Sequence, residues 1–252
     1  MTLKIVRRLL PKWGTTYGPV GEGPFAAILV LHGSEGGWSG WSHQFATLLA
    51  AHGFLAFPFS YSRDGNAWNA GSIRDVPLDR TVQVLKALRA FEYAGPKVGI
   101  LGFSRGAEHA LLVATLMAAE RMDGQPDAIA AHAAPDVVCG AFDSRRWRDK
   151  GDPGWQSWDA AERAWTWRGS SEELKPTTQI AVERITAPIF LSHGIADDVW
   201  SVEMTRRLQA RLLAAGRAPQ VHYFEGQRHM FDSAGQNDLN ERLIGFFGEE
   251  LG

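Results

Sequence analysis

The sequence predicts an α/β protein built on a mostly parallel, twisted sheet with helices on both faces. Three observations predict this fold: short runs alternate with longer helical patterns, the runs are mostly apolar, and turn residues follow most of them. Such runs are typical of strands that are buried on both faces between two helical layers. The 252 residues suffice for one domain of this class, and we expect residues 1–252 to form it.

The alternation can be followed from the N-terminus. One or two extra strands are expected within residues 3–20, before the regular pattern begins. The expected strands then cover residues 25–31, 54–57 (where Pro58 ends the run), 97–101, 128–132, 188–192 and 221–224. The expected helices cover residues 42–51, 78–91, 107–119, 202–214 and 239–247. A helix separates each of these strands from the next, with one exception.

The exception is a Trp-rich insertion at residues 139–184, before the strand at 188–192. Five of the ten tryptophans lie in it: Trp147, Trp155, Trp158, Trp165 and Trp167. Connections of this kind usually have about 2–6 residues. An insertion of this length is typical of a cap over a site, and we expect a cap here. The alternative is a surface excursion that its tryptophans anchor to the domain.

The charge balance excludes one class of partner. Lys and Arg number 26 against 28 Asp and Glu, a net charge of −2, which excludes nucleic-acid binding by bulk positive charge. The single cysteine, Cys139, excludes an intramolecular disulfide and a multi-cysteine zinc site. No apolar run is long enough for a signal peptide or a bilayer span. We therefore expect a cytoplasmic protein without membrane or nucleic-acid partners.

A candidate nucleophile follows the strand at 97–101. Gly102-Phe-Ser104-Arg-Gly106 has the pattern G-x-S-x-G between an expected strand and an expected helix. In that context the serine lies in a sharp, strained turn above the carboxyl ends of the strands, and glycines allow the close approach of neighbouring backbone. The helix N-terminus offers free N–H groups to a developing oxyanion. The alternative is an ordinary glycine turn.

A serine nucleophile needs a base, and the base needs an acid that orients it. On this architecture the order is Ser, acid, His. The strand at 188–192 leads into Asp197 and Asp198, and the strand at 221–224 leads into a loop with His229. The spacing Gly194-x-x-Asp197 favours Asp197 as the acid, whereas Asp198 would cap the next helix or face water. The other histidines are interpreted as packed or surface side chains.

An oxyanion hole needs two N–H donors. We expect one from the backbone of Arg105, directly after the serine, and one from the glycine-rich loop at 32–37. In that loop Ser34 is the favoured donor and Glu35 the alternative. His43, close to the same loop, is a weaker rival for the base. A phosphate-binding loop is disfavoured because no Lys-Ser/Thr follows the glycines.

These residues resemble the α/β-hydrolase superfamily over nearly the whole chain. More narrowly, they resemble the C-terminal catalytic domain of acyl-CoA thioesterases and bile acid-CoA:amino acid N-acyltransferases, with dienelactone hydrolase-like relatives. The segments that carry the resemblance are Gly33-Ser-Glu-Gly-Gly37, His52-Gly-Phe54, Gly102-Phe-Ser-Arg-Gly-Ala-Glu108 and Gly194-Ile-Ala-Asp-Asp-Val-Trp200-Ser-Val-Glu-Met204. The resemblance implies the α/β-hydrolase fold and the site roles given above: Ser104, Asp197, His229, and the backbone of Ser34 and Arg105.

Two departures from this family bear on function. Animal members carry an N-terminal β-sandwich domain, for which we expect no room in this chain. The amino-acid-conjugating members typically use cysteine as nucleophile, so Ser104 favours hydrolysis over transfer to an amino acid.

The predicted function is therefore a serine hydrolase that cleaves a small-molecule carboxylic ester or thioester through an acyl-enzyme on Ser104, without metal or cofactor. The alternatives are a dienelactone hydrolase-like or general carboxylesterase activity, and a non-catalytic binding protein on the same fold. The expected substrate contacts are Glu35, Trp38, Phe103 and Trp200.

Two features of the insertion also bear on the substrate. Arg145, Arg146 and Arg148, with Arg63 and Arg74, could meet an anionic group such as a CoA phosphate, or be solvated. The tryptophans could form an apolar acyl pocket, or pack the insertion onto the domain.

Overall fold

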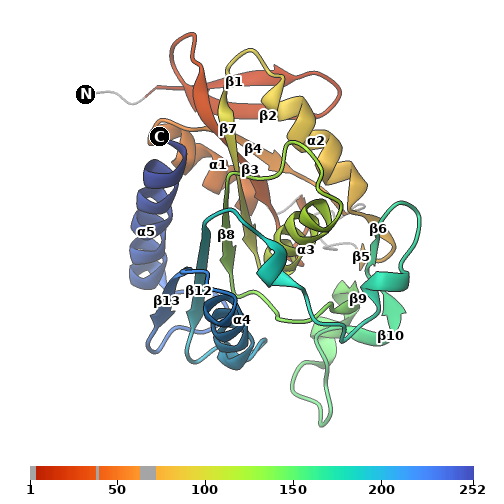
Figure 1. Cartoon of the computed structure of the whole chain (residues 1–252). Coiled ribbons are helices and arrows are strands. Elements are labelled where there is room, and N and C mark those ends of the chain that lie inside the picture. The colour runs from red at the N-terminus through yellow and green to blue at the C-terminus, as the bar shows by residue number, and fades with distance from the viewer. Residues whose placement is uncertain (1–3, 38–39, 63–71) are drawn as a thin grey trace.

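A twisted eight-stranded sheet forms the centre of the molecule (Figure 1). The computed structural model describes residues 4–37, 40–62 and 72–252, without the side chains of Ser144, Trp147 and Arg148. The strand order is β1-β2-β4-β3-β7-β8-β12-β13. β1 and β2 pair antiparallel with each other, and β2 pairs antiparallel with β4, whereas the pairings from β4 to β13 are parallel. The mostly parallel sheet predicted from the sequence is confirmed.

Each expected strand and helix is present, with small differences at the ends. The strands of the sheet are β1 (Ile5–Leu10), β2 (Gly14–Pro19), β3 (Phe25–Leu31), β4 (Leu55–Phe59), β7 (Ala94–Phe103), β8 (Ala128–His132), β12 (Ile189–Gly194) and β13 (Gln220–Phe224). The helices are α1 (Trp41–Ala51), α2 (Asp79–Arg89), α3 (Arg105–Ala119), α4 (Val202–Ala214) and α5 (Ser233–Leu251).

Two ends differ from the expectation for physical reasons. β4 does not end at Pro58: it continues to Phe59, in parallel register with β3. Proline is tolerated there because residue 58 faces the same neighbouring strand as Ala56, and the pairing with that strand, β2, is at Ala56. The sheet therefore does not need an N–H donor at Pro58. α5 begins at Ser233 and not near residue 239, because the Asp232 carboxylate caps the helix by accepting the N–H of Gly235 at 2.8 Å.

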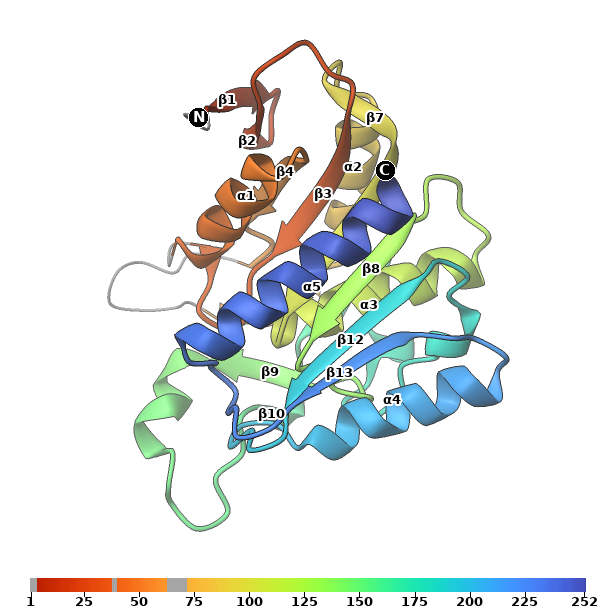
Figure 2. The same cartoon turned by 90° about the vertical axis from the view of Figure 1, so that its left-hand side faces the viewer.

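The helices form a layer on each face of the sheet. α1 and α5 cover one face, and α2, α3 and α4 cover the other (Figure 2). Each layer has its own apolar core. The first core includes Phe45, Leu49, Leu243 and Phe247, and the second includes Leu85, Leu111, Leu208 and Trp165. Burial on both faces explains why the central strands are apolar throughout. Within the described residues, no helix combines the length and the apolar character needed to cross a membrane.

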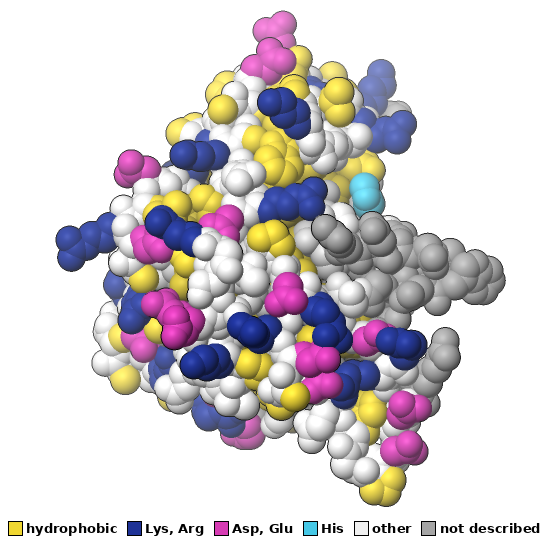
Figure 3. All heavy atoms as spheres, turned by 90° about the vertical axis from the view of Figure 1, so that its right-hand side faces the viewer, with side chains coloured by type: hydrophobic (Ala, Val, Ile, Leu, Met, Phe, Trp, Pro, Cys, Tyr) yellow, Lys and Arg dark blue, Asp and Glu magenta, His cyan; other side chains and the backbone are white. Residues whose placement is uncertain are grey.

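The insertion folds onto the segment that follows β4. It contains β9 (Gly140–Asp143), β10 (Asp159–Arg163) and β11 (Trp165–Thr166), together with short 3₁₀ turns. β9 pairs with β5 (Ser72–Ile73), and β11 pairs with β6 (Val76–Pro77). Figure 3 shows this side of the molecule, where basic and acidic side chains are interspersed.

Two tryptophans of the insertion pack it onto the domain. Trp165 is fully buried, and its indole N–H donates to Glu108 of α3 at 2.7 Å. Trp167 donates to Glu120, at the end of the same helix, at 2.7 Å. The structure therefore favours anchoring by these two tryptophans over an acyl pocket formed by them.

Candidate active site

The turn between β7 and α3 presents Ser104 in a strained conformation. Its backbone angles are φ 53° and ψ −117°, which a residue with a side chain adopts only when its surroundings enforce it. A Cβ on Gly102 would collide with the carbonyl of Gly106, and a Cβ on Gly106 would collide with the carbonyl of His32. The turn thus depends on glycine at both positions, as the motif predicts.

The structure brings together the three side chains that the sequence places far apart. The hydroxyl of Ser104 lies 3.0 Å from Nε2 of His229, and Nδ1 of His229 lies 2.8 Å from Oδ2 of Asp197. Asp198 points elsewhere and pairs with Lys150 at 2.8 Å. Of the two adjacent acids, Asp197 is therefore the one that contacts the imidazole.

The loops that carry Asp197 and His229 are packed directly on one another. A Cβ on Gly194, at the end of β12, would collide with the backbone carbonyls of Gln227 and Arg228. The N–H of Ala196 donates to the Gln227 carbonyl at 2.9 Å. Gly194, the glycine of the Gly-x-x-Asp spacing, therefore allows the loop of the acid and the loop of the base to approach closely.

Four donors surround the buried carboxylate of Asp197. Oδ1 accepts the backbone N–H groups of Val199 at 2.8 Å and Trp200 at 2.9 Å. Oδ2 faces His229 and also Nε2 of His193, at 3.0 Å. Burial alone would raise the pKa of Asp197, but the hydrogen bonds from His193, His229 and the Trp200 backbone hold it well below its usual range. The carboxylate is thus ionised and can stabilise a charged imidazole.

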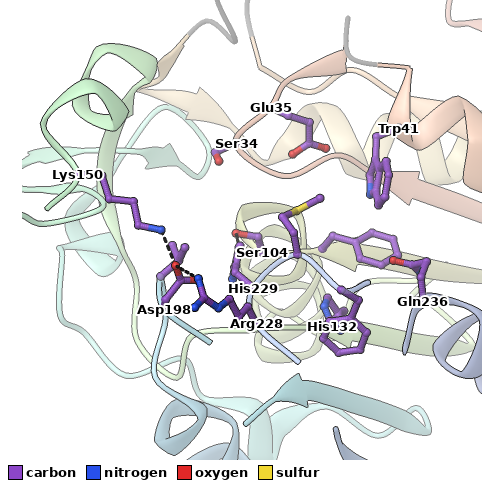
Figure 4. A pocket seen from close by; sticks show the side chains of 14 residues that line it. Ser34, Glu35, Trp41, Ser104, His132, Lys150, Asp198, Arg228, His229 and Gln236 are labelled. Atoms are coloured by element: carbon purple, nitrogen blue, oxygen red, sulfur yellow. Dashed lines mark hydrogen bonds and ion pairs between the residues drawn. The ribbon is translucent and has the colours of Figure 1, made fainter. Parts of the chain in front are cut away.

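A cavity of about 620 Å³ opens beside Ser104 (Figure 4). Its apolar lining comes from Trp41, Phe103, Val199, Met230 and Phe231. Its charged lining comes from Lys150, Asp198 and Arg228, and Figure 4 shows these three gathered on the side away from Trp41. Ser34 and Glu35, in the loop after β3, face Ser104 across the cavity. Ser104 thus lies between an apolar end and a charged end.

Burial shifts the pKa values of two titratable side chains of the lining. Burial raises the pKa of Glu35, although its carboxylate accepts the Gly33 N–H at 2.8 Å and the N–H of its own residue. Burial lowers the pKa of His132 to about 3, and its Nδ1 lies 2.9 Å from the Ser192 hydroxyl. The His132 imidazole is therefore uncharged near neutral pH.

The expected substrate contacts have mixed outcomes. Glu35 and Phe103 line the cavity, and Trp38 lies outside the described residues. Trp200 does not line it: its ring is 3% exposed, and its indole N–H donates to Ser157 of the insertion at 3.0 Å. The prediction for Trp200 is corrected to a packing role behind His229, whose ring centre lies 6.0 Å away.

The arginines of the insertion are already compensated by acids. Arg145 pairs with Asp143, Arg146 with Asp159, and Arg74 with Glu162. These arginines line a separate hollow together with acidic side chains. The Arg63 position and the Arg148 side chain lie outside the described residues. The basic side chains at the Ser104 cavity are instead Lys150 and Arg228, and both lie within 4.0 Å of the Asp198 carboxylate.

Three residues at the site escaped prediction from the sequence. Lys150 reaches the cavity only through the fold of the insertion, which no sequence pattern indicated. Arg228 precedes His229 directly, and its position in that loop was an available signal. His193 is the penultimate residue of β12, four residues before Asp197, and the sequence there is typical of a packed histidine. The rival His43 contacts the Tyr17 hydroxyl, at 2.9 Å, on the surface. Among the described residues, no cluster of His, Cys, Asp or Glu is arranged to hold a metal.

The chain belongs to the alpha/beta hydrolase family, whose model matches residues 28–236. It is 26% identical to acyl-coenzyme A thioesterase 6 of Mus musculus over 227 residues, which cover 86% of this chain and 51% of that protein. The chain thus spans about half the length of the curated relatives that it matches.

Solved structures share the fold. A putative dienelactone hydrolase from Klebsiella pneumoniae has a TM-score of 0.65 at 15% identity, covering 98% of this chain and 99% of that one. A puromycin-hydrolyzing peptidase from Mycobacterium tuberculosis has a TM-score of 0.68 at 17% identity, covering 99% of this chain and 40% of that one. At these identities the likeness concerns the fold alone.

Proposed function

We propose that the protein is a serine hydrolase that cleaves a carboxylic thioester or ester through an acyl-enzyme on Ser104. The observation that carries the proposal is the chain of contacts at the cavity. The Ser104 hydroxyl lies 3.0 Å from Nε2 of His229, whose Nδ1 lies 2.8 Å from the buried Asp197 carboxylate. This is the geometry that a nucleophile, its general base and an orienting acid require.

In the proposed first step His229 takes the proton of Ser104 while the serine oxygen attacks the acyl carbon. Asp197 stabilises the imidazolium that forms and keeps Nδ1 protonated. Collapse of the tetrahedral intermediate expels the thiol or alcohol, which receives its proton from His229. A water molecule, activated by the same imidazole, then attacks the acyl-enzyme and releases the acid and the free serine.

The oxyanion of the intermediate would lie between the start of α3 and the loop after β3. We assign the donors to the backbone N–H groups of Arg105 and Ser34, each worth about 3 kcal/mol in comparable sites. The alternative donor, the Glu35 amide, already has a partner in its own carboxylate, which favours Ser34. The Arg105 side chain does not take part, because it is 2% exposed and bonded inside the domain.

A thioester is the favoured substrate. The similarity to acyl-coenzyme A thioesterase 6 supports it, and so does a cavity with an apolar end for an acyl group. The other end carries two cations, Lys150 and Arg228, against the one acid Asp198. The second candidate is a dienelactone hydrolase-like or general carboxylesterase activity, which would use the same three side chains. We expect kcat/KM to be at least tenfold higher on acyl-CoAs than on simple esters of the same acyl group. Equal values would reject the thioester preference.

A non-catalytic binding protein on this fold is the alternative from another class. It is disfavoured because all three positions hold residues competent for catalysis, and because these residues are in contact.

Replacing Ser104 tests the proposal. Ser104→Ala should lower kcat on an aryl ester at least about 1,000-fold, since hydrolysis would lose its nucleophile while the binding site remains. Ser233→Ala, at the exposed start of α5, is the matched control and should keep wild-type kcat. A Ser104→Ala variant with wild-type turnover would reject the acyl-enzyme mechanism.

A further inference from the structure

The carboxylate of Asp197 has a partner that a serine–histidine–acid arrangement does not require. His193, the penultimate residue of β12, is fully buried, and its Nε2 lies 3.0 Å from Oδ2 of Asp197. The same oxygen faces Nδ1 of His229 at 2.8 Å. Two imidazoles thus contact the same carboxylate oxygen. His193 comes from strand β12, and His229 comes from a loop.

The hydrogen positions on His193 follow from its neighbours. An ionised carboxylate can only accept a hydrogen bond, so Nε2 carries a hydrogen. On the other side of the ring, Nδ1 lies 2.8 Å from the hydroxyl of Thr205 in α4, which can donate to it. The Trp200 carbonyl, 3.1 Å from Nε2, is a second acceptor for the same N–H. Each neighbour of the ring is therefore consistent with the neutral Nε2–H tautomer.

We propose that His193 is a positioning residue, which holds the acid in place from the sheet and sets the pH at which His229 becomes a base. The inference rests on the proposed function, in which Asp197 orients His229. β12 carries His193, and the backbone N–H groups of Val199 and Trp200 occupy the other oxygen. Three of the four groups that contact the carboxylate therefore come from outside the His229 loop.

The hydrogen bond from His193 also takes up part of the negative charge on Oδ2. Without it, the full charge would act on His229, the imidazolium would be favoured, and the neutral base would appear only at higher pH. The other groups facing His229 are Ser104, Glu35 and His132, and those facing His193 are His132 and the uncharged Thr205. The charges of Lys150, Asp198 and Arg228 line the same cavity.

Two substitutions separate the hydrogen bond from the volume of the ring. His193→Leu removes the donor and keeps an apolar side chain of similar size, and Thr205 retains the Ala134 carbonyl, at 3.5 Å, as an acceptor. His193→Gln can place an amide N–H where Nε2 was. His222→Leu is the matched control, because His222 lies on the neighbouring strand β13 and contacts Arg242.

The decisive readout is the titration midpoint of His229, followed by NMR. We expect His193→Leu to raise the midpoint by about half to one pH unit, and the acid limb of kcat/KM to move with it. His193→Gln should return both toward wild type, and His222→Leu should move neither. If His193→Leu loses activity or thermal stability while the midpoint stays at its wild-type value, His193 only fills space and the proposal is overturned.

A second measurement needs no variant. In the wild-type protein labelled with ¹⁵N-histidine, the hydrogen of His193 should be on Nε2, and a hydrogen on Nδ1 alone would overturn the proposal. Neither NMR readout depends on turnover. A wild-type protein that is inactive on esters and thioesters would therefore reject the proposed function, whereas an unshifted midpoint or the wrong tautomer would reject the role of His193.

Discussion

Two buried carboxylates, one at the carboxyl ends of the parallel strands and one beneath the insertion, have pKa values that are shifted in opposite directions. The side chains of Asp197 and Glu108 are both fully buried. Asp197 has four donors, and its pKa lies well below the usual range. Glu108 accepts the N–H of Cys139 and the indole N–H of Trp165 on one oxygen, and its other oxygen lies 3.0 Å from the Arg105 guanidinium. Burial nevertheless raises the pKa of Glu108.

The difference fits the role proposed for Asp197 as the acid of the site, and a packing role for Glu108. The donors of Asp197 come from its own loop, from β12 and from the loop of His229, so its charge is directed at the cavity. The partners of Glu108 come from α3 and from the insertion. The hydrogen bonds that Arg105 and Glu108 make with the insertion therefore tie it to the helix that begins beside Ser104. We therefore expect substitutions of the first carboxylate to affect turnover, and substitutions of the second to affect stability.

The largest effect is expected at Asp197. Asp197→Asn removes the charge that stabilises the imidazolium and can favour the wrong tautomer of His229, which should lower kcat about 1,000- to 10,000-fold. Asp198→Asn is the matched comparison and should change kcat only a few-fold, because Asp198 contacts Lys150 and not His229. Steady-state kinetics on one substrate measures both. Equal losses in the two variants would remove the distinction between the adjacent acids.

The next effect concerns stability. Glu108→Ala leaves the Arg105 guanidinium buried without its ionic partner, which should lower the free energy of unfolding by about 3–5 kcal/mol. Glu120→Ala breaks the similar bond to Trp167, but Glu120 also pairs with the exposed Arg168 and is itself partly exposed, so the loss should be about 1 kcal/mol. Urea unfolding at neutral pH measures both losses. Similar losses would show that burial does not distinguish the two anchors.

A smaller effect is expected from pH. Burial lowers the pKa of His32 to about 4 and that of His132 to about 3, whereas an unfolded imidazole takes up its proton near pH 6.5. Below that pH the unfolded state binds more protons, so the free energy of unfolding falls as the pH drops from about 6.5 to about 4. Burial also lowers the pKa of His109, which adds to this loss. The raised pKa values of Glu35 and Glu108 act in the opposite direction, and we expect a net loss of stability.

Urea unfolding across this pH range checks the sign. A protein whose stability stays constant down to pH 4 would contradict the assignment of neutral, buried imidazoles. His132→Gln removes one of the titrating groups, and its stability should therefore depend less steeply on pH than that of the wild type.

The surroundings of the two carboxylates also differ in how far they could be predicted from the sequence. Ser104, Asp197 and His229 each lie after a strand that was predicted from the sequence, and the ends of parallel strands meet at one edge of a sheet. Local patterns therefore brought them to one place. The helix at 202–214 was predicted with its observed bounds for the same reason, because its apolar periodicity and the following glycine are local signals.

The insertion carries no such local signal. β9, β10 and β11 have between two and five residues, and β9 and β11 pair with the two-residue strands β5 and β6. Their conformation depends on tertiary contacts such as that between Trp165 and Glu108. The positions of Lys150 and of Trp200, whose indole bonds to the insertion, depend on the same contacts. His193 reads as a core histidine because its link to Asp197 appears only when the loop folds back.

The most direct test of the account is to label the protein with a fluorophosphonate and to locate the modified residue by peptide mass spectrometry. An activated serine reacts with this probe, whereas an ordinary surface serine does not. The account predicts one phosphonylated residue, Ser104, with labelling strongly reduced in His229→Ala and unchanged in His222→Leu. No labelling of Ser104, or labelling that persists without the His229 imidazole, would contradict the claim that these side chains form a catalytic unit.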